Sequence, residues 1–514
     1  AHPPESPARS PARPRSQAQG QCVFVGTPEW LSRRVSSLGH MPRQNLDQVA
    51  GSADTAPATI KKVAIVKVAR TTRERLKATL RHQQEALSPR VLRRTLTELQ
   101  AVVDPRVGEL EGSRRARAVA NWYSKASAEQ RRDAWLLMSE QFAPDATKVN
   151  AAREQYEAAL GTPEEGQAEI RLRRAFESPR TRLLQRFAAF PDGMRFLVDL
   201  RAELLPHLKS EKRLLALDAE LETLFSTWFD VGFLELRRIS WDSPASLIER
   251  LIKYEAVHDI KGWADLKNRL DSDRRCYGFF HPRMPDEPLI FVEVALMDEI
   301  ADSITPLLDE SAAPADLTKA TTAIFYSISS TQPGLRGVSF GDSLIKRVVE
   351  TLKDGFPKLK VFATLSPIPG FRGWLAKNAA AMLQKLSDSE RAELGKALGE
   401  KAPTPGRFLE AAELMREASG ADPAARLLRQ SAAYYLAHEW QDGKPLDAVA
   451  RFHLGNGALV QRLNWAADPS GKGWKQSYGM MVNYLYDLKR FDKHRTQLAR
   501  CKIPVSREIE NLEF

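Results

Sequence analysis

The sequence has few of the residues that build disulfide frameworks, metal sites and membrane spans. It holds three cysteines in 514 residues, Cys22, Cys276 and Cys501, with no C-x-x-C or other paired spacing. This scarcity argues against a disulfide framework or a zinc site and favours a reducing compartment. The nine histidines show no H-x-x-x-H spacing, so no metal site is expected. No apolar run approaches the roughly 18–20 residues of a membrane span, so no membrane partner is expected.

A strong excess of one charge is also missing. Lys and Arg total 76 against 65 Asp and Glu, which gives a net charge of +11. The basic residues are interspersed with acidic ones, a pattern more typical of a solvated surface than of a nucleic-acid face. No RNA-binding motif or aromatic-interleaved basic stretch is present, so a nucleic-acid partner is not expected. The length allows two or three domains.

The composition divides the chain into three parts. Residues 1–58 open with "AHPPESPARSPARPRSQAQG", lack apolar periodicity and are expected to be a disordered leader or, because "GHM" at 39–41 resembles a vector junction, a vector-derived segment. Residues 59–232 carry helical periodicity, as in "MRFLVDLRAELLPHL", and are interpreted as a helical domain for packing and oligomerisation. Residues 233–514 are richer in strand patterns and form the third part.

This third part contains a β-α-β pattern. "EPLIFVEVALM" (287–297), "TAIFYSISS" (322–330) and "KVFATLS" (360–366) have the composition of strands. "GDSLIKRVVETLKDGFP" lies between the last two and has one apolar helical face, so the flanking strands are expected to be parallel. Residues 379–440 return to helix as an insertion, and "ARFHLGNGALVQRLNW" and "GMMVNYLYDL" are interpreted as two further strands. An α+β protein of two domains is predicted.

Four segments are candidates for chemistry. The turn "TQPGLRGVSFGDS" (331–343) places glycines before a helix, which suits either an anion cradle or a tight βα turn, and it is neither a Walker loop nor a G-x-G-x-x-G fingerprint. Ser366 follows a strand in "LSPIPGF", where two prolines stiffen the loop, although a plain Ser-Pro turn explains the pattern equally. His453 is a core histidine or a proton-transfer group. Tyr484 and Tyr486 share one strand face, where packing is the default role.

Taken in order, these segments resemble the malonyl-CoA decarboxylase family. The resemblance covers roughly residues 60–490 and is carried by "FYSISSTQPGLRGV", "GDSLIKRVVETLK", "LSPIPGF", "ARFHLGNGA", "NWAADPS" and "GMMVNYLY". It implies a helical N-terminal domain, a GNAT-like (acetyltransferase-fold) α/β catalytic domain with a helical insertion, and decarboxylation of malonyl-CoA to acetyl-CoA and CO2. It further implies no metal or prosthetic group, and a homo-oligomer with the tetramer as the expected state.

The resemblance also assigns residues. The family's serine falls on Ser366, its histidine on His453 and a further tyrosine on Tyr486. The loop for the phosphates of CoA falls on Arg336, Gly337, Val338, Ser339, Phe340, Gly341 and Asp342. The family can carry a glutamate in this loop where this chain has Ser339, which puts the role of a loop carboxylate in doubt. The chain ends "ENLEF" rather than in the Ser-Lys-Leu signal of some members, so a bacterial-type cytoplasmic location is expected.

The expected mechanism assigns different roles to two of these residues. Ser366 is expected to position the malonyl carboxylate, and His453 to protonate the enolate that CO2 loss leaves. Two alternatives compete with this interpretation. An acyl-CoA-dependent N-acyltransferase of the same fold would need an amine acceptor, whereas a non-enzymatic helical scaffold or nucleic-acid binder is suggested only by the net charge.

Overall fold

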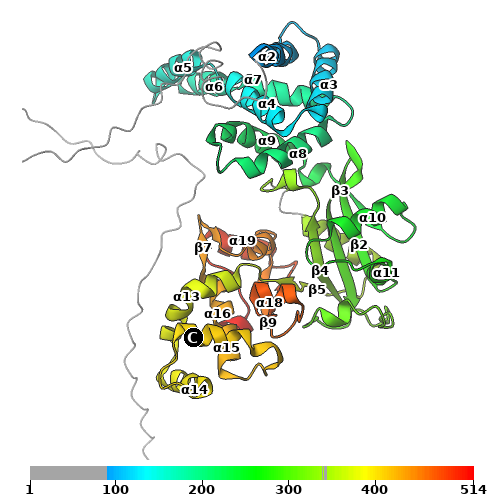
Figure 1. Ribbon diagram of the computed structural model, residues 1–514, viewed down its shortest axis with the longest axis vertical. Coiled ribbons are helices and arrows are strands. Elements are labelled where there is room, and N and C mark those ends of the chain that lie inside the picture. Colours follow the sequence, from blue (N-terminus) through cyan, green and yellow to red (C-terminus); the bar gives the residue numbers. More distant parts are fainter. Residues whose placement is uncertain (1–88, 339, 341–343) are drawn as a thin grey trace, which may run out of the picture.

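The computed structural model describes residues 89–338, 340 and 344–514. The predicted leader, residues 1–58, therefore lies outside the described residues. The described chain begins with a helical region, continues into a mixed sheet, and ends in a second group of helices that packs on that sheet (Figure 1). The prediction of an α+β protein, helical first and α/β second, is confirmed.

From residue 89 onward, where the description of the chain starts, the helical region contains eight α-helices. Their bounds are α2 (Pro89–Val103), α3 (Glu109–Lys125), α4 (Ala128–Gln141), α5 (Ala146–Ala159), α6 (Glu165–Phe176), α7 (Pro179–Ala189), α8 (Gly193–Leu204) and α9 (Leu215–Trp228). Local sequence starts several of them: Ser127 forms a capping box with Gln130 before α4, and Ser178 caps α7 with a proline at its first position. Most leucines and phenylalanines of α7, α8 and α9 are buried and form its core.

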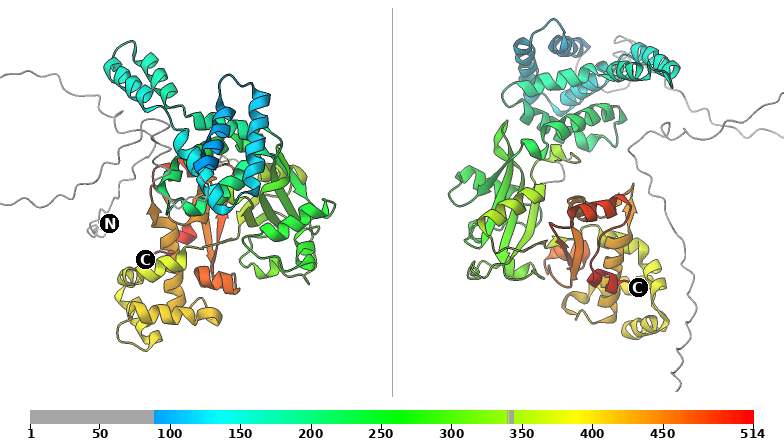
Figure 2. Two further views of the ribbon diagram at one scale, coloured as in Figure 1. Left: turned by 45° about the horizontal axis from the view of Figure 1, so that its top comes forward. Right: turned by 180° about the vertical axis from the view of Figure 1, so that it is seen from behind.

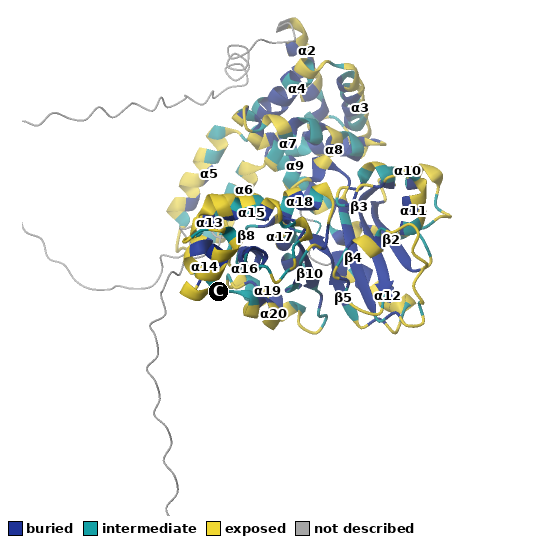
Figure 3. Cartoon of the chain, turned by 60° about the horizontal axis from the view of Figure 1, so that its bottom comes forward, coloured by how far each residue is buried: buried dark blue, intermediate teal, exposed yellow. Residues whose placement is uncertain are grey.

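The α5–α6 hairpin differs from the other helices because it packs mainly on itself. It projects from the helical region (Figure 2). Its buried residues are Ala152, Tyr156 and Ala168. Figure 3 shows β2, β3 and β4 as buried, whereas α5 is largely exposed. The hairpin therefore contributes little to the core of the chain to which it belongs.

An eight-stranded mixed sheet follows, with the order β1-β2-β3-β4-β5-β10-β6 and with β9 paired to β10. The strands are β1 (Glu235–Ile239), β2 (Arg274–His281), β3 (Met284–Met297), β4 (Thr322–Ser330), β5 (Val361–Thr364), β6 (Ser366–Pro367), β9 (Leu459–Asn464) and β10 (Met481–Leu485). Strands β4 and β5 are parallel and are connected through α12 (Leu344–Gly355), as the sequence predicted. Helices α10 (Ala245–Tyr254) and α11 (Trp263–Arg269) lie between β1 and β2 in the chain.

The C-terminal lobe, residues 366–512, carries the remaining helices. They are α13 (Phe371–Lys385), α14 (Asp388–Leu398), α15 (Pro405–Glu413), α16 (Pro423–His438), α17 (Ala448–Gly455), α18 (Gly471–Ser477), α19 (Phe491–Ala499) and α20 (Arg507–Leu512). A small hairpin, β7 (Trp440–Gln441) and β8 (Lys444–Pro445), leads into α17. No helix among the described residues is long and apolar enough to cross a membrane.

Three expectations from the sequence need correction. His453 lies on a helix, α17, and not on a strand, because Asp447 caps the segment and Ala450, His453 and Leu454 form one buried helical face. Strands β1 and β2 were missed, since the arginines in "ELRRI" and "RRCYGFFH" hide the strand pattern. The cysteine pattern did not predict the disulfide that Cys501 forms, whereas Cys276 is a buried free thiol.

Candidate active site

One cavity lies where the two parallel strands separate. Strand β4 pairs with β5 only from Thr322 to Phe325, and then continues to Ser330 paired with β3 on its other edge. One residue after β5 the chain enters β6, and both strands pair antiparallel with β10 in one register. A cavity of about 620 Å³ opens between the diverging strands, and its walls come from β4, the loop 332–340, residues 365–367 and α17. Ligands of open α/β sheets bind beyond the carboxyl ends of strands, which is where this cavity lies.

A chain of hydrogen bonds reaches one wall of this cavity. His453 Nε2 lies 3.1 Å from Ser366 Oγ, and His453 Nδ1 lies 2.7 Å from Tyr486 Oη. Ser366 and His453 line the cavity, and Tyr486 lies behind them with 2% of its surface exposed. The structure thus brings together three residues that the sequence separates by up to 120 positions (486 − 366).

The hydrogen-bond partners assign the tautomer of His453. Tyr486 Oη is buried, and among the described residues His453 Nδ1 is its hydrogen-bond partner, so the phenol donates to Nδ1. The proton of the imidazole then lies on Nε2, which donates to Ser366 Oγ. The Ser366 hydroxyl in turn donates to Thr364 Oγ1 at 2.9 Å. The free chain therefore holds His453 as a proton donor directed at Ser366.

Burial keeps this group of residues uncharged. Burial lowers the pKa of His453 to about 3, because desolvation disfavours the charged imidazolium. Desolvation also raises the pKa of Tyr486 well above its ordinary value. At neutral pH the pair is therefore a neutral imidazole hydrogen-bonded to a neutral phenol.

Strand β10 fixes the position of Ser366. Val482 pairs with Ser366 across the sheet, and the Tyr484 amide donates to Thr364 Oγ1 at 3.1 Å. The Tyr484 ring stacks on the His453 imidazole with 4.6 Å between centroids. Ser366 therefore belongs to a short paired strand rather than to a free Ser-Pro turn, so that its hydroxyl is held in one place.

The predicted phosphate loop forms another wall of the cavity. Arg336, Gly337, Val338 and Phe340 line it, whereas Ser339, Gly341 and Asp342 lie outside the described residues. Gly337 has a φ of 83°, a backbone conformation that favours glycine. Arg336 is the one cationic side chain among the described residues that line the cavity.

The helical region holds this loop, through a residue that the sequence interpretation missed. Arg201 of α8 is 2% exposed, and its Nη1 donates to the carbonyl oxygens of Gly334 at 2.8 Å and Arg336 at 2.9 Å. Its Nε binds Asp218 Oδ1 at 2.8 Å. One feature of the sequence could have identified Arg201. It lies on the apolar face of a helix, four residues after Leu197 and three before Leu204, where an arginine needs buried partners.

Close packing reinforces this contact between the helical region and the loop. A side chain at Gly334 would place its Cβ 1.9 Å from the Val198 carbonyl oxygen of α8. The amide of Val231 also donates to the carbonyl of Phe340 at 2.9 Å. The helical region, for which the sequence suggested only packing and oligomerisation, thus also supports one wall of the cavity.

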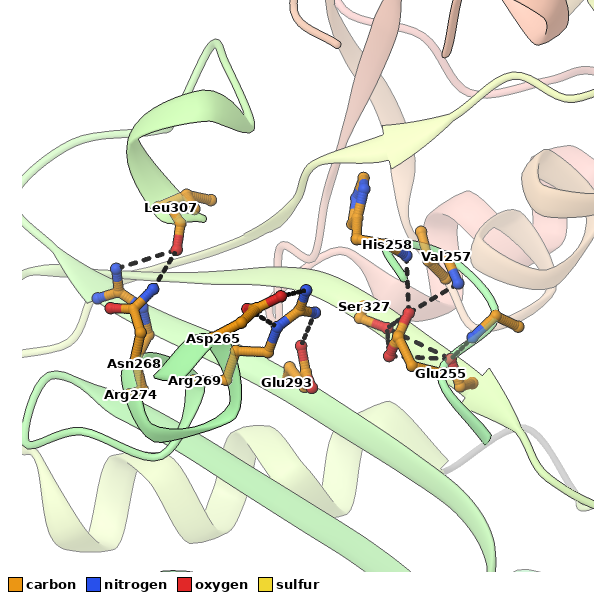
Figure 4. A network of polar contacts seen from close by, with 12 residues as sticks. Glu255, Val257, His258, Asp265, Asn268, Arg269, Arg274, Glu293, Leu307 and Ser327 are labelled. Carbon is orange, nitrogen blue, oxygen red and sulfur yellow. Dashed lines mark hydrogen bonds and ion pairs between the residues drawn. The ribbon is translucent and has the colours of Figure 1, made fainter. Parts of the chain in front are cut away.

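A buried carboxylate supports the wall at Val257. Glu255 accepts hydrogen bonds from the amides of Val257 and His258 at 2.7 and 2.8 Å and from the Ser327 hydroxyl of β4 (Figure 4). Lys472 of the C-terminal lobe donates to the Val257 carbonyl at 2.9 Å. Val257 is therefore fixed from both sides of the cavity.

The site contains titratable groups, but the described residues hold no cluster of three or more His, Cys, Asp or Glu side chains that could bind a metal ion. The groups present are suited to hydrogen bonding and proton transfer: a serine hydroxyl, a neutral imidazole and a phenol. Their arrangement can orient an acyl group in the cavity and deliver a proton to it.

Known protein families match both parts of the chain. The family model "Malonyl-CoA decarboxylase C-terminal domain" matches residues 232–512, and the model "Malonyl-CoA decarboxylase N-terminal domain" matches residues 142–229. Mitochondrial malonyl-CoA decarboxylase of Anser anser anser is 39% identical over 343 residues, which are 63% of this chain and 67% of that protein. The Mus musculus protein of the same name is 37% identical over 366 residues, 67% of this chain and 73% of that protein.

Solved structures agree with these matches. The crystal structure of malonyl-CoA decarboxylase from Rhodopseudomonas palustris has a TM-score of 0.71 at 39% identity and covers 82% of this chain and 99% of its own. The structure from Cupriavidus metallidurans has a TM-score of 0.67 at 41% identity and covers 82% of this chain and 100% of its own. The chain belongs to the malonyl-CoA decarboxylase family and is a carboxy-lyase.

Proposed function

We propose that this chain converts malonyl-CoA to acetyl-CoA and CO2 in the cavity between β4 and α17, with Ser366 positioning the malonyl carboxylate and His453 protonating the enolate. The observation that carries this proposal is the hydrogen-bonded chain Tyr486–His453–Ser366, which ends at the cavity wall.

The chemistry requires control of one bond and one proton. Loss of CO2 from a malonyl thioester leaves an enolate, and it is fastest when the breaking C–C bond overlaps the carbonyl π system. The Ser366 hydroxyl, which donates to Thr364 in the free chain, can turn to the carboxylate and hold it out of the thioester plane. A hydroxyl suits this task better than a cation, because a salt bridge to the carboxylate would stabilise the substrate more than the transition state.

Protonation of the enolate consumes one proton in each turnover. The Nε2 proton of His453 is directed at Ser366 Oγ, so it can reach the enolate carbon directly or through that hydroxyl. As Nε2 gives its proton to the enolate, the Tyr486 phenol can pass its own proton to Nδ1, so the negative charge of the enolate moves to the Tyr486 oxygen and not to the imidazole. Tyr486 is thus proposed to support His453, and water must restore the proton afterwards.

The CoA portion of malonyl-CoA is proposed to lie along the loop 332–340, which the helical region supports. The exposed Arg336 and the backbone of Gly337, Val338 and Phe340 border the cavity, and residues 336–342 lead into α12. The start of a helix and a cationic side chain suit the phosphates of CoA. The mostly apolar strand and helix side chains deeper in the cavity suit the pantetheine arm and the acyl group. No metal ion or prosthetic group is assigned to this reaction, so chelators should leave turnover unchanged.

Incubation with malonyl-CoA alone tests the proposed function. Release of CO2 together with equimolar acetyl-CoA, in the absence of any amine, is the expected result. Turnover that requires an added amine and transfers the intact malonyl group would instead identify an N-acyltransferase and overturn the proposal. Loss of CO2 release in both Ser366→Ala and His453→Ala, with folding retained, would assign the activity to this cavity.

We further propose a homo-oligomer, with the tetramer as the expected state, assembled through the helical region and located in the cytoplasm. The support for assembly is the α5–α6 hairpin, which exposes Leu160, Ile170 and Phe176 and has a minimal core of its own. Helices of this length are marginal alone, so another surface is needed to stabilise them. Light scattering of Ile170→Lys should report a smaller particle than the parent chain; an unchanged mass would exclude the hairpin as the interface.

A further inference from the structure

We propose that Asp447 is a positioning residue for the decarboxylation, because it joins the loop that follows Ser366 to the helix that carries His453. This proposal rests on the roles proposed above for Ser366 and His453. Asp447 is 2% exposed and is not among the described residues that line the cavity, so its effect on the reaction has to pass through other groups.

The first connection runs from Asp447 to the histidine helix. Asp447 Oδ1 accepts hydrogen bonds from the amides of Val449 and Ala450, both at 2.9 Å, and so caps the N-terminus of α17. Helix α17 is eight residues long and holds His453 in its last turn. Ala448 and Val449, in its first turn, line the cavity. The cap therefore fixes the direction of α17 and the position along its axis at which His453 faces Ser366.

The second connection runs from the same carboxylate to the serine loop. The hydroxyl of Tyr435 donates to Asp447 Oδ2 at 3.3 Å, and Gly370 lies against the same carboxylate, since a Cβ at Gly370 would be 3.5 Å from Asp447 Oδ2. Gly370 is four residues after Ser366, at the end of the stiff Pro-Ile-Pro-Gly turn. A Cβ at Gly370 would lie 2.3 Å from the Tyr435 hydroxyl, so this close approach requires glycine.

The two connections matter because the reacting groups come from separate segments. Ser366 and His453 are 87 residues apart in the chain and meet across a single contact of 3.1 Å. Hydrogen bonds weaken steeply with distance and angle, and a displacement of about 1 Å can lower turnover about 100-fold. One buried carboxylate that contacts both segments holds this distance, whereas Thr364 fixes only the strand side.

Variants of Asp447 separate positioning from plain folding. Asp447→Ala removes both connections and should lower kcat about 10- to 100-fold, with little change in the KM for malonyl-CoA because the loop 332–340 is untouched. Asp447→Asn keeps one side-chain oxygen, which can still cap α17, but replaces the other with an NH2 group that accepts no hydrogen bond from the segment at Gly370. Its kcat should therefore lie between those of the parent and the alanine variant. Asp145→Ala is the matched control: Asp145 caps α5, remote from the cavity, and should leave kcat within about 2-fold.

The measurement is CO2 release under saturating malonyl-CoA, with thermal melting of each variant beside it. The proposal is supported if Asp447→Ala loses kcat at constant KM while Asp145→Ala does not, at comparable losses of melting temperature. A folded Asp447→Ala with parental kcat would overturn it. If Asp447→Ala does not fold, Asp447→Asn decides: lowered kcat at constant KM supports the connection to Gly370, and parental kcat refutes it. Parental activity in His453→Ala would instead overturn the underlying function.

Discussion

Two walls of the same cavity are held in place by different parts of the molecule. The loop 332–340 is fixed from outside the sheet, by Arg201 and the α8 backbone of the helical region. The wall with Ser366 and His453 is fixed within the C-terminal lobe, by β10 and Asp447. Binding of the CoA moiety and chemistry on the acyl group should therefore respond to different mutations, the first through KM and the second through kcat.

The largest effect is expected on the chemical wall. Ser366→Ala and His453→Ala should each lower kcat about 10²- to 10⁴-fold, the range typical of positioned acid–base groups, with a small change in KM. Steady-state CO2 release measures both constants, and circular dichroism controls for folding. Near-parental turnover in either variant would remove that residue from the mechanism.

The next effect is expected on the binding wall. Arg201→Lys keeps the charge beside Asp218 but cannot form the two hydrogen bonds to the Gly334 and Arg336 carbonyls with the same geometry. We expect KM to rise about 10-fold and kcat to change little, since each lost hydrogen bond contributes about 1 kcal/mol.

A matched arginine provides the control for this variant. Arg283→Lys removes a comparable set of bonds, from the Arg283 guanidinium to the carbonyls of Ala188 and Phe190, which also join the sheet to the helical region. Arg283 does not line the cavity, so its KM should stay at the parental value. Equal shifts of KM in the two variants would show that the helical region acts only through general stability.

Tyr486→Phe should have a smaller effect on the chemical wall. It removes the hydroxyl that binds His453 Nδ1 at 2.7 Å but keeps the buried ring. We expect kcat to fall about 3- to 10-fold, in line with one hydrogen bond of about 1 kcal/mol, and KM to stay constant. A loss as large as that of His453→Ala would show that the phenol itself supplies the proton.

The last prediction concerns stability at acidic pH rather than turnover. The pKa of His453 is lowered to about 3 in the folded chain, from about 6.5 when unfolded. Below pH 6.5 the unfolded chain gains a proton there that the folded chain does not bind, so the free energy of unfolding falls as pH drops toward 3. At pH 5 this amounts to about 2 kcal/mol.

The variant that tests this is His453→Gln, which does not titrate. It should lose less stability than the parent between pH 7.5 and pH 5, measured from urea midpoints. His258, whose pKa burial lowers to about 4, leaves a remaining slope. An unchanged slope in His453→Gln would show that His453 is protonated in the folded chain.

The sequence predicted the parts of this molecule whose pattern is local. The β4–α12–β5 unit was found because apolar alternation and a 3.6-residue period stand beside each other there. The eight residues of α17 are too few to show that period, and the helix depends on the Asp447 cap, so "ARFHLGNGALV" was interpreted as a strand. Ser366, His453 and Tyr486 were singled out, but their contact distances depend on strand pairing that no local pattern encodes.

For the same reason, the sequence could not predict which distant residues hold the cavity walls in place. Arg201 and Gly334 are 133 residues apart, and neither motif points to the other. No local pattern singles out Asp447, which precedes the histidine motif. Residues that hold a site together from a distance are recognised by their buried partners, which only the folded chain shows.

The central claim is that Ser366 and His453 act as one unit across their 3.1 Å contact, and a double-mutant cycle in kcat tests it most directly. Residues that act together are strongly non-additive, since removing either one already disables the pair. The account predicts that Ser366→Ala/His453→Ala releases CO2 from saturating malonyl-CoA within about 3-fold of the slower single variant. A double variant whose loss equals the product of the two single losses would contradict it.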